Sequence, residues 1–316
     1  MRFYGADETR ARLPFAPLVD ALRAMFVRGC SLAPRQVLEL AGAGAEAVTS
    51  LVMPAWLEGG SYGVKVVNIA PGNAARGLPG LHSTYVLYDA RTGVPLAWID
   101  GDEITARRTA ATSALAASWL APAGARHLAV IGAGRIARLL PEAHRVVRPI
   151  ERVTVWARSP ARAEALVVAL AAQGFDAHAA TSVEAAVADA DIVSCATLAR
   201  APIVCGRWLA PGSHLDLIGS FSPAMREADD ACFAAARVIV DSDDAATKSG
   251  DLIGPLARGI LCREDIGTLA RLARAQRDDD RVAGQRTVFK SVGSALEDLA
   301  AAILVHDADA QRQASG

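Results

Sequence analysis

Lysine is scarce in this chain: only three of its 33 basic residues are lysines, Lys65, Lys248 and Lys290, and the rest are arginines. Basic and acidic residues nearly balance, 33 against 34, which leaves a formal net charge of −1. Without a cationic surplus the chain lacks the attraction that nucleic acids and anionic membranes exert on basic proteins. We therefore expect neither of them as a partner.

Long apolar runs and metal-ligand spacings are also missing. Charged residues or glycines interrupt every hydrophobic stretch, and the opening residues MRFYGADETRAR contain no apolar signal segment. These absences predict a cytoplasmic protein with no membrane span. The five cysteines form no CxxC pair, and the six histidines show no HxxxH or HExxH spacing. We therefore expect free, mostly buried thiols and no metal site.

The middle of the chain alternates short β-branched runs with alanine-rich helical stretches. This alternation predicts a doubly wound parallel sheet of the Rossmann type, in an α/β protein whose length suggests about two domains. The six expected strands are residues 127–132, 152–157, 175–179, 191–197, 214–219 and 237–241.

The first 120 residues follow a different pattern. Residues 62–70 and 82–100 alternate apolar and polar side chains, and ARTG (90–93) is a hairpin turn signal, so an antiparallel sheet is expected. Residues 103–121 form an alanine-rich pattern that predicts a long helix leading into the parallel sheet. The segment 287–308 predicts one more apolar-faced helix.

The string HLAVIGAGRIARLL contains a GxGxxA arrangement of Gly132, Gly134 and Ala137 directly after a strand. The first glycine permits a tight turn, the second lets a pyrophosphate approach the backbone, and the alanine allows close packing of helix on strand. At the head of a six-strand pattern this arrangement predicts dinucleotide binding. Pro141 falls about two turns into the expected helix, where it costs about 3 kcal/mol unless the helix bends or starts late.

The end of the second expected strand bears on the choice of dinucleotide. An NAD-specific site usually has a carboxylate here for the ribose 2′-hydroxyl, whereas this chain has Arg158 and Ser159. A guanidinium and a hydroxyl suit a 2′-phosphate. NADP(H) is therefore favoured, with NAD(H) as the alternative.

Several strings outside the glycine loop resemble the ornithine cyclodeaminase and mu-crystallin family, in the family's order and over nearly the whole chain. The resemblance implies a homodimer that acts on a small amino or imino acid. It also implies that a smaller α+β substrate and dimerisation domain (1–120 plus 288–316) holds an inserted Rossmann domain (121–287). The strings are MPAW (53–56), GVKVV (63–67), YDARTG (88–93), IDGDEITARRTAA (99–111), GAGRIA (132–137), RPIERVTVWAR (148–158), MREADD (225–230), KSGD (248–251) and TVFKSVG (287–293).

The resemblance also assigns site residues. Arg35, Lys65 and Arg108 match the positions that hold the substrate carboxylate, and Lys65 and Arg108 are the expected catalytic pair; a carboxylate suits an arginine fork with an added point charge. Since Arg107 precedes Arg108 on a helix, only one of the two can face the site. AGAGAEAV (41–48), after Arg35, looks like a local insertion. The cofactor is assigned to His82, Thr109, Gly132, Gly134, Arg135, Ile136, Ala137, Arg158, Ser159, Thr197, Leu198 and Ser291.

One string departs from the cyclodeaminase pattern. Cyclodeaminases of this family carry an acid/base aspartate in GGD followed by CPGK, whereas this chain has GSFSPAMR, with Phe221 at the aspartate position and Met225 at the lysine. Phenylalanine cannot transfer a proton. The string looks most like the Δ1-pyrroline-2-carboxylate reductases of the family. The alternative is that Phe221 is a core aromatic and another acid, such as Asp229 or Asp230, enters the site.

We therefore expect an NAD(P)H-dependent oxidoreductase that reduces Δ1-pyrroline-2-carboxylate or its six-membered homologue to L-proline or L-pipecolate. Arg108, Lys65 and Arg35 would hold the carboxylate, and Phe221 would pack against the apolar ring or the nicotinamide. Neutral Lys65 could also bond the imine nitrogen. The alternatives are an ornithine cyclodeaminase, an alanine dehydrogenase, or a non-catalytic protein that sequesters a cofactor and a small ligand.

Overall fold

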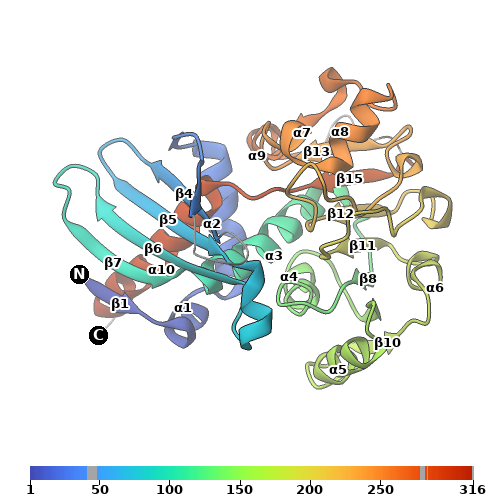
Figure 1. Ribbon diagram of the computed structural model, residues 1–316, viewed down its shortest axis with the longest axis horizontal. Helices are drawn as coiled ribbons and strands as arrows, with labels where there is room; N and C mark the ends of the chain where they lie inside the picture. Colours follow the sequence, from blue (N-terminus) through green and yellow to red (C-terminus); the bar gives the residue numbers. More distant parts are fainter. Residues whose placement is uncertain (41–47, 278–281, 283, 315–316) are drawn as a thin grey trace. The chain divides into compact units, whose positions relative to one another are not determined.

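The computed structural model describes residues 1–40, 48–277, 282 and 284–314, which form two compact units (Figure 1). Unit 1 consists of Met1–Arg108 with Ala295–Gly316, and unit 2 of Thr109–Ser294. The family resemblance implies domain boundaries at 120/121 and 287/288, whereas the compact units divide at 108/109 and 294/295. The expected insertion falls, except for Val48, outside the described residues.

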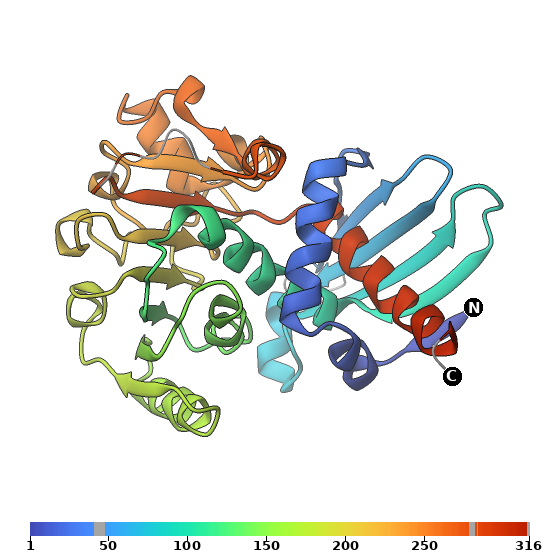
Figure 2. The same cartoon turned by 180° about the vertical axis from the view of Figure 1, so that it is seen from behind.

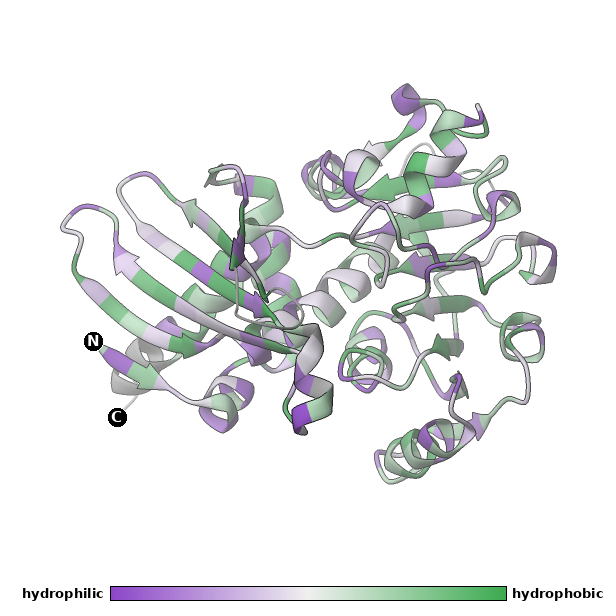
Figure 3. Cartoon of the chain, viewed as in Figure 1, coloured by the Kyte–Doolittle hydropathy of each residue, from purple (hydrophilic) through white to green (hydrophobic). Residues whose placement is uncertain are grey.

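Unit 1 contains a sheet whose central strands are antiparallel, as predicted, with β1 parallel to β7 at one edge. Gly93, at φ +72°, closes the predicted turn between β6 and β7. Figure 3 shows these strands striped with hydrophobic and hydrophilic residues, the alternation on which the prediction rested. The seven strands are β1 (Arg2–Tyr4), β2 (Ser31–Leu32), β3 (Gln36–Leu40), β4 (Val48–Trp56), β5 (Ser61–Ile69), β6 (Leu81–Asp89) and β7 (Pro95–Asp100), in the order β1-β7-β6-β5-β4-β2, with β3 also paired to β4.

The helices of unit 1 gather on one face of this sheet, as Figure 2 shows from behind. Helix α10 (Ala295–Ala314) packs against α2 (Phe15–Arg28) and on β4, β5 and β6. Helix α1 (Ala6–Arg12) contacts β7, and the 3-10 helix η1 (Pro71–Arg76) connects β5 to β6. The helix-covered face holds the unit's buried side chains, among them the one lysine of the sheet.

Unit 2 is built on an eight-stranded parallel sheet, and all six predicted runs are confirmed as its strands β8 to β13. Side chains on both faces of the central strands are buried, as expected for a parallel sheet between helices. The strands are β8 (His127–Ile131), β9 (Arg152–Trp156), β10 (Asp176–Ala179), β11 (Ile192–Cys195), β12 (His214–Leu217), β13 (Arg237–Val240), β14 (Gly267–Thr268) and β15 (Thr287–Lys290), in the order β10-β9-β8-β11-β12-β15-β13-β14.

The prediction that residues 287–308 form one helix was wrong at its start. Thr287–Lys290 is strand β15, which is fully buried between β12 and β13. Gly293, at φ +77°, lies between this strand and α10, which begins at Ala295. The strand arrives from far along the sequence, so local alternation of strands and helices gave no sign of it.

The helices of unit 2 alternate with the strands. Helix α3 (Gly101–Leu120), predicted at 103–121, carries the boundary between the two units inside it. None of the described helices of the chain is long and apolar enough to cross a membrane. The others are α4 (Leu140–Arg145), α5 (Pro160–Ala171), α6 (Val183–Val187), α7 (Ala245–Lys248), α8 (Gly250–Ala257) and α9 (Leu269–Ala275), with 3-10 helices η2 (Gly206–Trp208), η3 (Asp230–Cys232) and η4 (Arg263–Asp265).

Candidate active site

Lys65 and Arg108 lie on two different elements of unit 1. Strand β5 directs Lys65 to the helix-covered face of the sheet, where its side chain is 2% exposed. Helix α3 supplies Arg108, which is 5% exposed. Arg107 faces elsewhere: its Nε donates to the carbonyl of Leu13 at 2.6 Å and its guanidinium lies over Phe15. Only one of the two adjacent arginines therefore joins Lys65, as helix geometry predicts.

Two carboxylates at the start of α10 bring these cations together. Asp298 Oδ2 lies 2.7 Å from Lys65 Nζ, and Asp298 Oδ1 accepts from Arg108 Nε at 2.9 Å. Glu297 accepts from Arg108 Nη1 at 2.6 Å. Both carboxylates are fully buried. Two positive and two negative charges thus form a neutral buried cluster, which satisfies the requirement that buried charges be paired.

Sequence reasoning missed Glu297 and Asp298. Acidic residues in the first turn of a helix are ordinary, because they favour the positive end of the helix dipole. The sequence LEDLAAAIL nevertheless offered a signal, since two acids directly precede a strongly apolar helical stretch. A carboxylate on the packing face of such a helix needs a buried cationic partner.

The electrostatics of the cluster distinguish its members. Burial lowers the pKa of Lys65 to about 8, with the charge of Arg108 adding to this effect and Asp298 opposing it. Burial pushes the pKa of Asp298 upward, but Lys65 and Arg108 outweigh it and hold that pKa below its usual value. Burial likewise lowers the pKa of Arg108, and the two carboxylates more than restore it. Of these three groups, Lys65 is therefore the one whose charge changes nearest neutral pH.

Donors remain on both cations after these contacts. The ammonium of Lys65 donates to Thr105 Oγ1 at 3.2 Å and pairs with Asp298, which uses two of its three N–H groups. Within the part of the chain that the structure describes, Arg108 Nη2 donates to no protein atom. The remaining N–H groups are suited to a carboxylate ligand.

The other expected residues of unit 1 lie at separate positions. Arg35 is half-buried between β2 and β3, and His82 is exposed on β6 opposite Asn68 of β5. Among the described residues no group of three or more potential metal ligands occurs.

The expected cofactor residues of unit 2 occur where parallel strands end. Because the strands of this sheet run in one direction, these carboxyl ends share one edge, the usual ligand-binding edge of an open α/β sheet. Thr109 lies elsewhere, buried in α3. The edge carries Gly132, Gly134, Arg135, Ile136 and Ala137 after β8, Arg158 and Ser159 after β9, Thr197 and Leu198 after β11, Phe221 after β12, and Ser291 after β15.

The glycine loop after β8 differs from prediction in one respect. Turns occupy the residues after Gly134, and helix α4 begins only at Leu140, which puts Pro141 in its first turn. Proline is tolerated there because the backbone N–H groups of a helix's first turn have no acceptor within the helix, so the missing N–H of proline breaks no hydrogen bond. The late start of the helix therefore removes the expected cost in stability. The loop itself keeps the predicted features. Gly132 has φ +124°, and Ala137 is fully buried.

Open space around Gly134 supports the fit to a dinucleotide. A Cβ atom built on Gly132 would lie 2.6 Å from the carbonyl oxygen of Ala196, so that glycine is needed for packing. Apart from its two neighbours in the chain, no described residue has an atom within 4 Å of a Cβ built on Gly134. The backbone at Gly134 is therefore accessible to a phosphate, as the loop's function requires.

Phe221 is not a core residue. Its side chain is 44% exposed, which overturns the alternative that it packs in the interior, while Met225 nearby is 8% exposed. The two alternative acids are engaged elsewhere. Asp229 accepts from the backbone N–H groups of Gly206 and Cys232, and Asp230 pairs with two arginines, Arg226 and Arg258.

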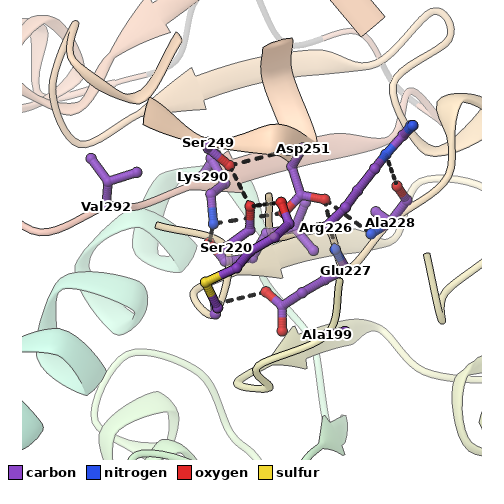
Figure 4. A network of polar contacts seen from close by, with 12 residues as sticks. Ala199, Ser220, Arg226, Glu227, Ala228, Ser249, Asp251, Lys290 and Val292 are labelled. Carbon is purple, nitrogen blue, oxygen red and sulfur yellow. Dashed lines mark hydrogen bonds and ion pairs between the residues drawn. The ribbon is translucent and has the colours of Figure 1, made fainter. Parts of the chain in front are cut away.

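Sequence reasoning also missed Glu227, a carboxylate that is fully buried behind this edge of the sheet. It lies within the string MREADD, but a glutamate among three other charged residues gave no sign of burial. Figure 4 shows it within a network of polar side chains from several elements of unit 2.

A parallel sheet in the order of a doubly wound fold, with a glycine loop after its first strand, defines a dinucleotide-binding protein of the Rossmann class. In unit 1, Lys65 on strand β5 and Arg108 on helix α3 present N–H donors of the kind that suits an anionic small molecule. The chain belongs to the ornithine cyclodeaminase/mu-crystallin family, whose model matches residues 28–313.

Relatives and solved structures agree with this membership. The chain is 40% identical over 305 residues to a Delta(1)-pyrroline-2-carboxylate reductase of Paracoccus denitrificans, with 94% of each chain covered. The structure of Thermococcus litoralis Delta(1)-pyrroline-2-carboxylate reductase with NADH and L-proline matches with a TM-score of 0.91 and 28% identity, covering 99% of this chain and 98% of that one. An archaeal alanine dehydrogenase dimer with bound NAD matches with a TM-score of 0.90 and 26% identity, covering 99% and 97%.

Proposed function

We propose that this protein is an NAD(P)H-dependent oxidoreductase that reduces a cyclic imino acid, Δ1-pyrroline-2-carboxylate or Δ1-piperideine-2-carboxylate, to L-proline or L-pipecolate. The observation that carries the proposal is the arrangement of Lys65 and Arg108 around Asp298, with N–H donors left over for a ligand. The Paracoccus relative and the Thermococcus structure, which bear the name of this reductase, support the same reaction class.

Lys65 and Arg108 bind the substrate carboxylate in this proposal. Their salt bridges to α10 fix both cations before the ligand arrives, so little side-chain entropy is lost on binding. Arg35 is the third candidate for the same carboxylate. Orientation of the ring then supplies most of the rate.

The residues at the carboxyl edge of the parallel sheet bind the nicotinamide cofactor, with the pyrophosphate at Gly134. When bound, the reduced nicotinamide supplies the hydride that the imine carbon accepts. The exposed Arg158 and half-buried Ser159 suit a 2′-phosphate, so we propose a preference for NADP(H). The relatives' structures with NADH and NAD support a nicotinamide cofactor in general.

The chemistry needs no general base at residue 221. The substrate imine carries its proton as an iminium ion, and addition of a hydride at carbon 2 gives the neutral amine directly. Phe221, exposed after β12, can pack against an apolar ring but cannot assist loss of ammonia from a linear diamino acid. This favours the reductase over an ornithine cyclodeaminase.

A steady-state assay tests the proposal. Purified protein is given NADPH or NADH with five- and six-membered cyclic imino acids, and separately L-ornithine or L-alanine with NAD⁺. We expect stoichiometric cofactor oxidation with the imines and formation of L-proline or L-pipecolate. Ammonia release from ornithine or alanine would establish one of the two alternatives, and cofactor binding without any turnover would establish a binding protein.

We also propose that the protein is a homodimer in which a second copy covers the helix-free face of the sheet in unit 1. Aromatic pairs lie on this face: Phe3 with Trp98 at 6.1 Å between ring centroids, and Tyr62 stacked on Tyr88 at 5.3 Å. The described helices of unit 1 pack on the opposite face (Figure 2). A broad apolar sheet face is typical of an interface between subunits.

A further inference from the structure

Glu227 joins two loops at the carboxyl edge of the parallel sheet. Its Oε1 accepts from the backbone N–H of Thr197 at 2.8 Å and from the Thr197 hydroxyl at 2.7 Å. Its Oε2 accepts from the backbone N–H of Gly219 at 2.6 Å. Thr197 belongs to the loop after β11 and Gly219 to the loop after β12. One fully buried carboxylate therefore binds both loops by three hydrogen bonds.

The backbone of Glu227 is fixed from the opposite side. Asp251, at the start of α8, accepts from the backbone N–H groups of Glu227 and Ala228 at 2.8 and 3.0 Å (Figure 4). Lys290 of β15 donates to the carbonyl of Leu217 at 3.0 Å and lies 3.8 Å from Asp251. The glutamate thus has little freedom to move away from the two loops.

A second residue of this network, Ser220, helps to hold the loop after β12. Ser220, next to Phe221, donates to the carbonyl of Met225 at 2.6 Å and bonds Ser249 at 2.8 Å. Gly219 allows direct contact between the loops, because a Cβ there would lie 1.8 Å from the carbonyl oxygen of Thr197. The loops are therefore packed backbone to backbone and held by buried side chains.

We propose that Glu227 is a positioning residue for the reductase reaction: it holds the cofactor loop (Thr197 and Leu198) and the substrate loop (Gly219 to Phe221) in one fixed arrangement, and its ionised form holds them most strongly. This inference rests on the proposed function, since that function gives the two loops their roles. Hydride transfer is sensitive to displacements of about 1 Å, so a residue that fixes both loops affects the rate without touching the substrate.

The preference for the ionised form follows from the donors. A backbone N–H points at each carboxylate oxygen, so an amide NH₂ on either side would oppose another donor, and a proton on either oxygen would make that oxygen a weaker acceptor. Among the described residues, the charged and titratable groups that interact electrostatically with Glu227 are Lys290, Asp251 and Cys195. Burial raises the pKa of Glu227 to about 7, with Lys290 opposing the rise and Asp251 adding to it. The hydrogen bonds from Thr197 hold this pKa lower than burial alone would. A loosened state in which Glu227 stays buried without them therefore binds the proton more tightly, and the loops should loosen as the pH falls below about 7.

The matched test compares Glu227→Gln with Asp216→Asn, another buried carboxylate of this sheet. Asp216 accepts from the hydroxyls of Ser113 and Ser194 and joins neither loop. Dissociation constants for NADPH and NADH are measured by cofactor fluorescence at pH 6 to 9, and circular dichroism checks folding. We expect E227Q to weaken cofactor binding at least tenfold at pH 8 and D216N to leave it within about twofold.

The wild-type pH profile provides a test that does not depend on a folded variant. Cofactor affinity should rise as the pH increases through about 7, and this step should be absent in E227Q. Affinity that is flat from pH 6 to 9 in the wild type, or equal affinities of E227Q and wild type at pH 8, would overturn the role of Glu227. Because binding is measured without substrate, a wild type that binds cofactor but reduces no imine refutes the proposed function and leaves this result intact.

Discussion

Asp298 contacts Lys65 and Arg108 with its two oxygens at once, one oxygen to each cation. A single carboxylate therefore sets the distance between the two groups that we propose to bind the substrate. The cluster is neutral as a whole, so attraction of a substrate carboxylate depends on oriented N–H groups more than on net charge. Such preorganised donors gain strength from a buried environment.

Replacement of Lys65 by methionine should lower kcat/KM about 10²-fold, which corresponds to about 3 kcal/mol from loss of a charge-assisted contact. NADPH affinity should stay unchanged, because Lys65 lies outside the cofactor edge. Lys248→Met is the matched control, since Lys248 pairs with Asp244 at the protein surface. Equal kinetics of K65M and K248M would remove Lys65 from the carboxylate site.

Asp298→Asn should destabilise unit 1, because among the described residues it leaves Lys65 and Arg108 with only one acidic partner, Glu297. Removing one member of a buried charge network costs about 3–5 kcal/mol. Urea unfolding measures the loss. Asp307→Asn, an exposed change on the same helix, is the control and should alter stability by less than about 0.5 kcal/mol. A similar loss in both variants would contradict the structural role of Asp298.

Arg158→Ala should reduce the preference for NADPH over NADH about tenfold or more, since it deletes the cation proposed to contact the 2′-phosphate. The effect should appear in KM for NADPH and leave KM for NADH nearly unchanged. Arg162→Ala, an exposed arginine on α5, controls for general loss of positive charge. If the ratio of the two cofactors is the same in R158A and wild type, Arg158 does not select the cofactor.

Asp216 should make stability depend on pH. Burial raises the pKa of this carboxyl to about 6, although Ser194 and Ser113 donate to it. The folded state therefore holds its proton more tightly than the unfolded state, whose pKa is about 3.9. The stabilisation from Asp216 is complete below pH 4 and is lost as the pH rises through 6, by about 3 kcal/mol.

Urea unfolding of wild type and Asp216→Asn at pH 4.5 and pH 8 isolates this contribution. The stability of wild type relative to D216N should fall between the two pH values. A constant difference would show that the carboxyl has an ordinary pKa in the folded protein.

Val86→Glu tests the proposed dimer. Val86 lies on β6, on the sheet face without helices, so a charge there should convert dimer to monomer with little effect on the fold of unit 1. Sedimentation velocity measures the change. Val168→Glu, an exposed position on α5, is the control. A wild type that sediments as a monomer, or a V86E variant that stays dimeric, would refute this interface.

The sequence predicted the parts of the fold that depend on local pattern. Short-range signals mark six strands of the parallel sheet and the hairpin around ARTG. These signals are the alternation of residue types and the turn residues, and the folded protein has the structures that they predict. Strand β15 has the same β-branched character but inserts between β12 and β13 from far along the chain. Local sequence patterns do not show which strands become neighbours in a sheet when those strands are far apart in the sequence.

The site was predictable where one residue type has few other uses. A lone lysine that is flanked by valines indicates a functional site. A glycine loop that directly follows a strand does so as well. Glu227 and Asp298 were missed because an acidic residue in a polar string looks solvated until the fold buries it. Their roles depend on partners such as Thr197 and Arg108, which are distant in sequence.

The buried charge cluster has a consequence for synthesis of the protein. Arg108 and Asp298 are separated by 190 residues, so the ribosome completes both cations and the whole parallel sheet before the carboxylates exist. Until then Lys65 and Arg108 lack the two carboxylates that neutralise them in the interior, and the sheet of unit 1 lacks helix α10. Helix α10 supplies countercharge and packing surface together, so final assembly of unit 1 must wait until this helix has been synthesised.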